Sequence, residues 1–323
     1  MSALRSMVAA IFVILALPSA CFAQDWPTRP IRFIVPFPAG GSTDVAARFV
    51  GEHLSRSLGQ QIYIENKSGA NGNVGIEAAA KSAPDGYTFL VSTDSIASNP
   101  HIYKMSVDVL KELVPVAQVS VQPIVLAAHP SLGVQSIEQL TAIAKRQRGL
   151  RYAIGGGVGS AQHIAMQWFA HLAGIELEPV PYRGGAQAIN DLIAGHVKLG
   201  SLGSTPLIPH HQAGTLRLLA QSMRERATSL PDVPTFQEAG LNGLVLDQWV
   251  GVFAPVGAPA TITSRLTAEI SKALGDPTVH ANLLKSGQDP VVGPTQQFAQ
   301  FVREEFAKYA RLVKELKIQG EAN

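Results

Sequence analysis

Cysteine is nearly absent from this chain of 323 residues, which contains only Cys21. A single cysteine excludes an intramolecular disulfide, and the C-x-x-C pair of thiol redox proteins is also missing. Hydrophobic residues make up 46% of the chain, so packed side chains can hold the fold together without covalent links.

Charge is also sparse. Charged residues account for 15% of the sequence, the formal net charge is +2, and lysines and arginines are scattered along the chain. Proteins that bind DNA, RNA or anionic lipid concentrate basic residues on one surface. We therefore expect no nucleic-acid partner.

Long hydrophobic runs are missing after the first 23 residues, where no stretch reaches the roughly 20 apolar residues that span a membrane. Residues 1–23 differ from the rest of the chain. Arg5 precedes an apolar run from Met7 to Leu17, and small residues follow up to Ala23, which is the pattern of a secretory signal peptide. We expect cleavage near Ala23 and a mature chain that begins at Gln24.

Cys21 permits a different interpretation of the same segment. The residues before it, Leu17 to Ala20, loosely resemble a bacterial lipobox, although Pro18 fits that pattern poorly. Lipidation at Cys21 and cleavage after Ala23 both place the protein outside the cytoplasm.

Common enzyme motifs are not found. The sequence has no G-x-S-x-G elbow, no H-E-x-x-H and no P-loop, and the adjacent His210 and His211 would point to different sides of a helix. Ser160 and His163 lie three residues apart on an expected helix, but no acid is near to orient the imidazole. We expect no enzymatic activity, metal or cofactor, and keep an exported hydrolase using Ser160 and His163 as a remote alternative.

The segments that are present alternate between strand and helix patterns from Pro30 onward, which favours βα units and largely parallel sheets. The expected strands are Ile31–Phe37, Ile62–Glu65, Tyr87–Ser92, Tyr152–Gly155, Glu178–Tyr182, Leu199–Gly203 and Leu216–Ser222. The expected helices are Thr43–Leu58, Val74–Ser82, Ile137–Arg146, Ala161–Leu172, Ala186–Ala194, Leu207–Gln212, Pro259–Leu274, Val279–Lys285 and Gln296–Leu316.

The length predicts two lobes, since single cores stop growing at about 250 to 300 residues. The apolar run Val119–Ala128 is the expected exit from the first lobe, and Trp249–Pro255 is the expected return. The first lobe would then be discontinuous, with residues 24–125 plus 250–323, and residues 126–249 would form the second. Two crossings leave room for a cleft between the lobes.

The segment VPFPAGGSTD, residues 35–44, joins a buried strand to a helix start. Gly40 and Gly41 allow the backbone to approach a ligand, and the free N–H groups of the first helical turn favour an anion such as a carboxylate. The same residues also fit an ordinary turn, with Ser42 as N-cap and Asp44 as a first-turn acid.

Three junctions of the second lobe have a similar composition. Gly155 to Ser160 precedes a helix that carries His163, Tyr182 to Gly185 places Tyr182 and Arg183 before two glycines, and Leu202 to Thr205 ends in two hydroxyl residues. Tyr182 would close over a ligand and Arg183 would pair with an acid. Each also fits a simpler role: His163 in packing or capping, Arg183 facing solvent, and Ser204 or Thr205 as an N-cap. A dinucleotide fingerprint is incomplete here, because the glycines give only G-x-G-x-x-S.

The sequence resembles the receptors of tripartite tricarboxylate transporters, also called Bug receptors, from Trp26 to the C-terminal helix. The resemblance rests on these segments: WPTRPIRFIVPFPAGGSTDVAAR (26–48), IENKSGANGNVG (64–75), PDGYT (84–88), VPYRGG (180–185), AGTLRLLA (213–220) and LPDVPTFQEAG (230–240).

The resemblance implies a type II periplasmic-binding-protein fold, with two α/β lobes joined by two crossovers and a ligand cleft between them. It implies a periplasmic monomer that captures a small organic acid with backbone amides and small hydroxyls and presents it to membrane permease subunits. Together with the residues singled out above, the expected ligand-binding set is Phe37, Ala39, Gly40, Gly41, Ser42, Thr43, Asp44, Ser92, Thr93, Gly157, Gly159, Ser160, His163, Tyr182, Arg183, Gly184, Gly185, Ser204 and Thr205.

One departure from the family pattern concerns the ligand. Many relatives have an aspartate just after the strand that corresponds to Leu199–Gly203, whereas this chain has Ser204 and Thr205 there. Without an acid for an ammonium group, a di- or tricarboxylate or an aromatic acid is favoured over an α-amino acid. A sensing role without transport stays open as an alternative.

Overall fold

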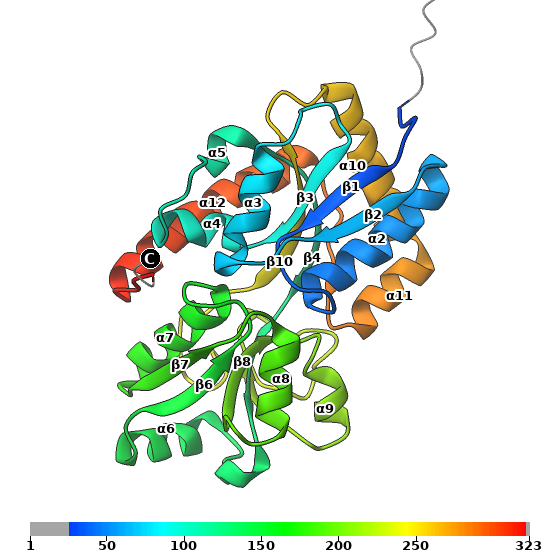
Figure 1. Cartoon of the computed structure of the whole chain (residues 1–323). Coiled ribbons are helices and arrows are strands. Elements are labelled where there is room, and N and C mark those ends of the chain that lie inside the picture. The colour runs from blue at the N-terminus through cyan, green and yellow to red at the C-terminus, as the bar shows by residue number, and fades with distance from the viewer. Residues whose placement is uncertain (1–25, 321–323) are drawn as a thin grey trace, which may run out of the picture.

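Two β-sheets, each with helices on both faces, form two lobes that lie one above the other in Figure 1. The computed structural model describes residues 26–320. The predicted signal peptide, residues 1–23, and its Cys21 lie outside the described residues.

Within residues 26–320, the sheet of the first lobe has six strands in the order β11-β4-β10-β3-β1-β2. These strands are β1 (Ile31–Val35), β2 (Ile62–Asn66), β3 (Thr88–Thr93), β4 (Leu113–Gln122), β10 (Gln248–Pro255) and β11 (Asp289–Pro290). Strands β1, β2 and β3 are parallel, and β10 is antiparallel to both of its neighbours, β3 and β4. The sheet is therefore mixed, where the sequence predicted largely parallel pairing.

The first sheet carries an apolar core on each face. The helices are α2 (Ser42–Leu58), α3 (Asn73–Ala80), α4 (Ser95–Ser98), α5 (Val109–Glu112), α10 (Ala260–Gly275), α11 (Pro277–Lys285) and α12 (Thr295–Glu315), with the short 3₁₀ helices η1 (Ala70–Gly72) and η2 (Asn99–His101). Side chains of α2, α10 and α11 share one core with the sheet, and those of α3, α5 and α12 share the other. Burial on both faces explains why β1 and β3 are almost continuously apolar.

The second lobe repeats this arrangement with five strands in the described chain, in the order β7-β6-β8-β5-β9. Its strands are β5 (Ile124–Ala128), β6 (Leu150–Ile154), β7 (Leu177–Pro181), β8 (Leu199–Gly203) and β9 (Arg217–Gln221), and its helices are η3 (Pro130–Leu132), α6 (Ile137–Arg146), α7 (Ala161–Ala173), α8 (Gly185–Ile193) and α9 (Ile208–Gln212). Helices α6 and α7 cover one face, and α8 and α9 cover the other.

The chain passes between the sheets at two places. Strand β4 ends at Gln122 and β5 begins at Ile124, so Pro123 alone separates the two sheets on the outward path, and β10 begins the return at Gln248. The predicted boundaries at 125 and 250 fall inside β5 and β10. The apolar run Val119–Ala128 hid this break, because the residues next to Pro123 on both sides, Gln122 and Ile124, are buried.

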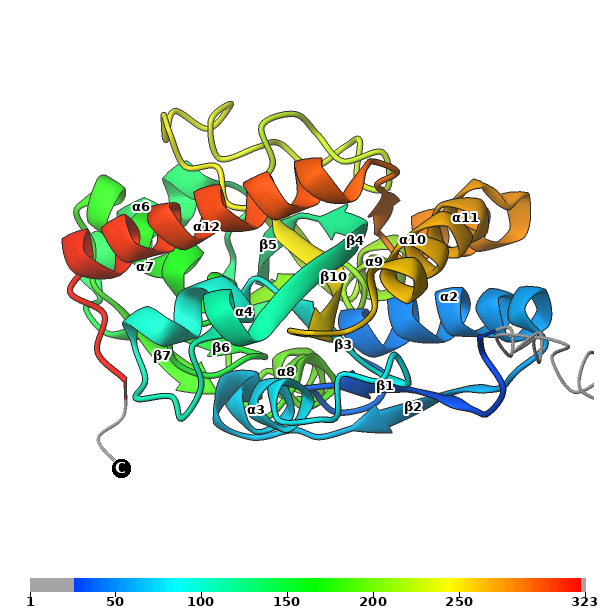
Figure 2. The ribbon, with the colours of Figure 1, turned by 90° about the horizontal axis from the view of Figure 1, so that it is seen from above.

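One apolar cluster spans both lobes. It joins Ala97 of the first lobe, Ala161 and Ile164 of α7 in the second, and Tyr309 and Leu312 of α12. Figure 2 shows α12 running along one side of the first lobe, and in Figure 1 its C-terminal end lies above α7. The C-terminal helix therefore ties the lobes together on one side.

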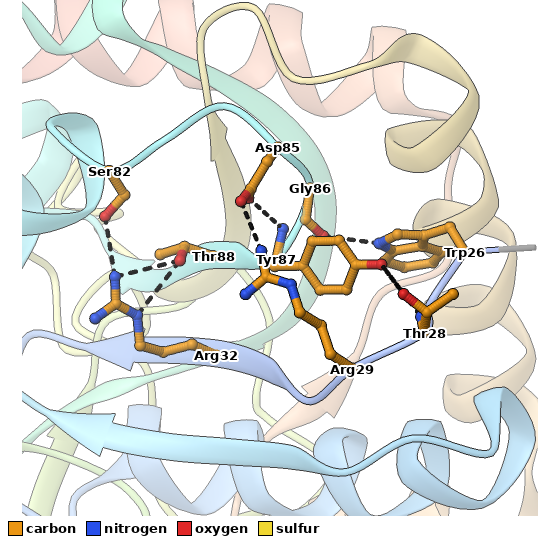
Figure 3. Close-up of polar contacts among 9 residues, drawn as sticks. All are labelled: Trp26, Thr28, Arg29, Arg32, Ser82, Asp85, Gly86, Tyr87 and Thr88. Carbon is orange, nitrogen blue, oxygen red and sulfur yellow. Dashed lines mark hydrogen bonds and ion pairs between the residues drawn. The ribbon is translucent and has the colours of Figure 1, made fainter. Parts of the chain in front are cut away.

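Two of the motifs behind the family resemblance meet at the end of the first sheet where β1 and β3 begin (Figure 3). The indole Nε1 of Trp26 donates to the Gly86 carbonyl at 2.9 Å, and Arg29 pairs with Asp85 at 2.7 Å while lying over the ring of Tyr87. These contacts fasten the beginning of the described chain to β3, which gives WPTRP and PDGYT a role in the fold.

Candidate functional site

A cavity of about 110 Å³ lies between the lobes. A space of about 10 to 15 Å³ by this measure holds one water, so the cavity has room for a small organic molecule. Its walls come from the ends of strands in both sheets and from the helices that follow them. The lining residues are Phe37, Pro38, Ala39, Gly40, Gly41, Ser42, Thr43, Asn71, Thr93, Asp94, Ser95, Gly155, Gly156, Ser160, Gln162, Gly184, Gly185, Ala186, Gln187, Gly203, Pro206 and Gln248.

Two helix N-termini open into the cavity from opposite lobes. Gly41 is the N-cap of α2 and Gly184 is the N-cap of α8, and neither has a side chain to cap its helix. The first N–H groups of a helix have no acceptor within the helix. The uncapped first turns of α2 and α8 therefore present free donors, and the positive ends of two helix dipoles, to the cavity.

Asp44 shapes the first of these turns without lining the cavity. Its carboxylate accepts from the Gly40 backbone N–H at 2.9 Å, from Asn66 at 2.9 Å, and from Arg48 at 2.8 and 2.9 Å. Burial works to raise the pKa of Asp44, but these hydrogen bonds outweigh it and hold the pKa below its ordinary value. Asp44 fixes the loop that carries Ala39, Gly40 and Gly41, where φ of Gly40 is +82°.

The turn before α7 is also held from within. Ser160 lines the cavity and accepts from the His163 backbone N–H at 3.3 Å, while the Nδ1 atom of His163 accepts from the Gly159 N–H at 3.0 Å. His163 is 6% exposed, and burial lowers its pKa to about 4, so the imidazole is neutral at physiological pH. The His163 ring supports the loop, and the Ser160 hydroxyl contacts the backbone of His163 rather than its ring.

Tyr182 and Arg183 lie outside the cavity, although the two glycines that follow them line it. The Tyr182 hydroxyl donates to Asp191 at 2.6 Å, and burial together with Asp191 raises the pKa of Tyr182 to about 12. Both residues line a second, more open hollow of about 660 Å³, which also includes Gly157 and Lys104. This outer hollow shares Phe37, Asn71 and Gly156 with the cavity.

Ser204 and Thr205 contact the crossing between the lobes instead of the cavity. The Ser204 hydroxyl donates to the Gly287 carbonyl at 2.7 Å, and both hydroxyls contact Oε1 of Gln122, the last residue before the first crossing. The side-chain amide of Gln122 donates in turn to Gln248 at 2.7 Å. These residues connect the lobes. Because Ser204 and Thr205 do not line the cavity, they could influence which acid is bound only indirectly.

Of the predicted set, ten residues meet at the cavity: Phe37, Ala39, Gly40, Gly41, Ser42, Thr43, Thr93, Ser160, Gly184 and Gly185. Nine lie beside or behind it: Asp44, Ser92, Gly157, Gly159, His163, Tyr182, Arg183, Ser204 and Thr205. Sequence reasoning did not single out Asn71, Asp94, Gln162 or Gln248 as site residues. The Gly/Asn-rich stretch from Gly69 to Gly72 indicates a turn and is the sequence feature that could have pointed to Asn71. Asp94 follows an expected strand and has no such signal.

The cavity has no cationic side chain among the described residues that line it, and Asp94 is its one ionisable group. A bound anion would therefore depend on backbone N–H groups, hydroxyls and side-chain amides. Among residues 26–320, no three His, Cys, Asp or Glu side chains gather closely enough to hold a metal ion. Within the same range, no helix combines the length and apolar character that crossing a membrane requires.

Known proteins share this architecture. The family described as "Tripartite tricarboxylate transporter family receptor" matches residues 46–318. Protein BugT of Bordetella pertussis is 35% identical over 323 residues, which cover 98% of each chain. The R. palustris protein Rpa4515, solved with adipate, has a TM-score of 0.88 at 33% identity and covers 92% of this chain and 100% of its own. MatC from Rhodopseudomonas palustris, with bound malate, has a TM-score of 0.82 at 29% identity and covers 89% and 100%.

Two mixed sheets, two crossings and an interlobe cavity define a solute-binding protein with the type II periplasmic-binding-protein fold, as the sequence predicted. The chain belongs to the tripartite tricarboxylate transporter receptor family. Its function is that of a solute-binding receptor.

Proposed function

We propose that this receptor binds a small organic acid in the interlobe cavity, in the periplasm, and presents it to the permease of a tripartite transporter. The observation that carries the proposal is the pair of uncapped helix N-termini, at Gly41 and Gly184, that face one cavity from opposite lobes. Two structural relatives, solved with adipate and malate, bind acids of this class.

The ligand contacts are assigned to the residues that line the cavity. Backbone N–H groups at Ser42, Thr43, Gly185 and Ala186 would hold a carboxylate, since the first turns of α2 and α8 lack internal acceptors for them. An acid held this way contacts both lobes at once. Binding therefore favours the closed arrangement by the difference in affinity between the closed and open states.

The same proposal covers the parts of the chain that frame the site. Residues 1–23 would be removed on export, and the two lobes would be divided at Pro123 and just before Gln248, where strand pairing changes sheet. The receptor would act as a monomer, with no cofactor and no bond made or broken in the ligand.

Thermal unfolding and titration calorimetry of the purified mature chain test this function. Adipate, malate, citrate and benzoate form the acid panel, and glucose and Mg²⁺ are the controls. At least one acid is expected to raise the melting temperature and to bind with one-to-one stoichiometry. Stabilisation by glucose or Mg²⁺ with no response to any acid would contradict the proposal.

A further inference from the structure

Asp94 occupies an unusual position in the cavity wall. It follows β3 at the start of α4, lies between Thr93 and Ser95, and lines the cavity while only 1% exposed. Its Oδ1 atom is buried and has no hydrogen-bond partner. A buried polar atom without a partner costs free energy, which a hydrogen-bonding partner at that position would recover.

Ionisable groups of α12 and of the segment before β10 act electrostatically on Asp94 or on one another. Glu305 of α12 pairs with Lys308 at 2.5 Å and accepts from the Trp249 indole at 3.1 Å. Asp247, just before β10, is half-buried, and its Oδ1 atom has no hydrogen-bond partner. The hydroxyl of Tyr309 on α12 is buried and also has no partner.

These groups act on Asp94 from each packed element. Glu305 from α12 disfavours its ionised form, while Lys308 from α12 and the Ala161 backbone N–H of α7 favour it. The charges of Asp94, Glu305 and Asp247 raise the pKa of Tyr309. The charge of Glu305 raises the pKa of Asp247, and the charges of Lys308 and Arg224 lower it. Burial and Glu305 together raise the pKa of Asp94 to about 7, and burial raises the pKa of Asp247 to about 6.

We propose that Asp94 contacts the bound acid and takes up one proton from solvent as the acid binds, so that its carboxyl group donates a hydrogen bond to the ligand carboxylate. This inference rests on the proposed function of the cavity. An ionised Asp94 would repel an anion in a cavity without a cation, whereas the neutral carboxyl supplies the missing donor. The proton is added to one Asp94 oxygen, and no other bond changes.

The sign of the pH effect follows from this exchange. A neighbouring anion disfavours the ionised carboxyl, so the acid-bound form holds its proton to higher pH than the free form. Below about pH 6 the free receptor is already protonated and uptake is small. Above about pH 7 uptake approaches one proton, and affinity falls by up to about tenfold per pH unit.

Titration calorimetry in phosphate and in Tris measures the uptake, because the two buffers differ in the heat of releasing a proton. The probes are adipate and malate, together with citrate or benzoate if either binds, at pH values from about 6.5 to 8.5. The expected result is an uptake that rises across this range towards one. Asp94→Asn should bind the same acid with no uptake and with little pH dependence.

Asp289→Asn is the matched control, because burial raises the pKa of Asp289 in the same direction but the residue does not line the cavity. Asp289→Asn should take up as many protons on acid binding as the unaltered receptor does. Binding without uptake in the unaltered receptor would overturn the role of Asp94 and leave the proposed function standing, and this measurement needs no variant. Proton uptake that persists in Asp94→Asn would also overturn the role of Asp94 and leave the proposed function standing. Failure of every acid to bind would overturn the proposed function, and the role of Asp94 with it.

Discussion

The side-chain amide of Gln288 donates a hydrogen bond to the Ser42 carbonyl oxygen at 3.1 Å. Gln288 is fully buried, and its own oxygen accepts from Ser120 at 2.8 Å. It follows Gly287, whose carbonyl accepts from Ser204 of the other lobe. A short path of hydrogen bonds therefore runs from the second lobe to the first turn of α2, which lines the cavity.

Gln288→Leu should weaken both stability and binding. It leaves the Ser120 hydroxyl without this acceptor and the Ser42 carbonyl without this donor, a loss of about 1 to 3 kcal/mol in the free energy of unfolding. Urea unfolding measures the first effect, and calorimetry with the acid that binds measures the second. Gln296→Leu, at an exposed position of α12, is the control and should change neither. If the two variants had the same stability and the same affinity, the hydrogen bonds of Gln288 would not contribute to folding or binding.

Gly184→Ala should reduce affinity while leaving the unliganded receptor nearly as stable. A Cβ at Gly184 would lie 3.2 Å from the Pro38 ring, which belongs to the opposite lobe, so Pro38 and the start of α8 must move apart by a few tenths of an ångström. The free N–H groups of α2 and α8 then no longer fit one ligand together. We expect an affinity loss of about tenfold, or 1.4 kcal/mol.

The control for Gly184 is Gly275→Ala, because an added Cβ at Gly275 meets no atom within 4 Å. This change should not alter binding, as measured by calorimetry. An unchanged affinity in Gly184→Ala would mean that ligand binding does not depend on the close approach of Gly184 to Pro38.

Asp44→Asn should destabilise the receptor at neutral pH and much less in acid. The pKa of Asp44 is held below its ordinary value, so its contribution is present above the unfolded pKa and disappears as pH falls through the folded one. At pH 7 we expect a loss of about 1 to 3 kcal/mol in the free energy of unfolding, with weaker acid binding because Gly40 loses its anchor.

Chemical unfolding of Asp44→Asn at about pH 7 and about pH 3 provides the test. Glu176→Gln, which breaks an exposed pair with Arg148, is the comparison and should cost less than about 1 kcal/mol. A loss in Asp44→Asn that stays constant down to acid pH would contradict the electrostatic account.

Asp94→Asn should stabilise the unliganded receptor at alkaline pH. The folded state keeps the Asp94 proton up to about pH 7, whereas the unfolded chain releases it near the ordinary aspartate pKa. The stability of the unaltered receptor therefore falls as pH rises between these two values, and the asparagine variant escapes this fall. Urea unfolding should show a gain on the order of 4 kcal/mol at pH 8 and little difference at pH 4. If the free energy of unfolding changed with pH in the same way for both proteins, this prediction would be contradicted.

Much of the fold follows from local sequence patterns. Helix α6 has its predicted bounds, Ile137 and Arg146, and β8 matches its predicted bounds at Leu199 and Gly203. The short elements α4 and α5, with four residues each, were missed, since one helical turn has no periodicity to detect. Strand β10 lies antiparallel between β3 and β4, and pairing between segments so far apart leaves no local mark.

The candidate site, too, could be predicted from the sequence only in part. Backbone features such as Gly40, Gly41, Gly184 and Gly185 were visible in the sequence, because glycine before a helix signals an approachable N-terminus. Side-chain directions were not visible. Tyr182 points to Asp191 and His163 to Gly159, since each satisfies a polar partner near its own loop. Asp94 was missed because its significance comes from α12, more than 200 residues later.

Strand β10 lies between β3 and β4, and it belongs to the part of the chain that is made last. During synthesis, β3 and β4 have no partner to join them until Gln248 to Pro255 has been produced. All strands of the second sheet precede that point, so the second lobe has its full set of strands while the first is still open. A ribosome that stops before β10 would release a chain with two exposed apolar strand edges, which is a substrate for chaperones and proteases.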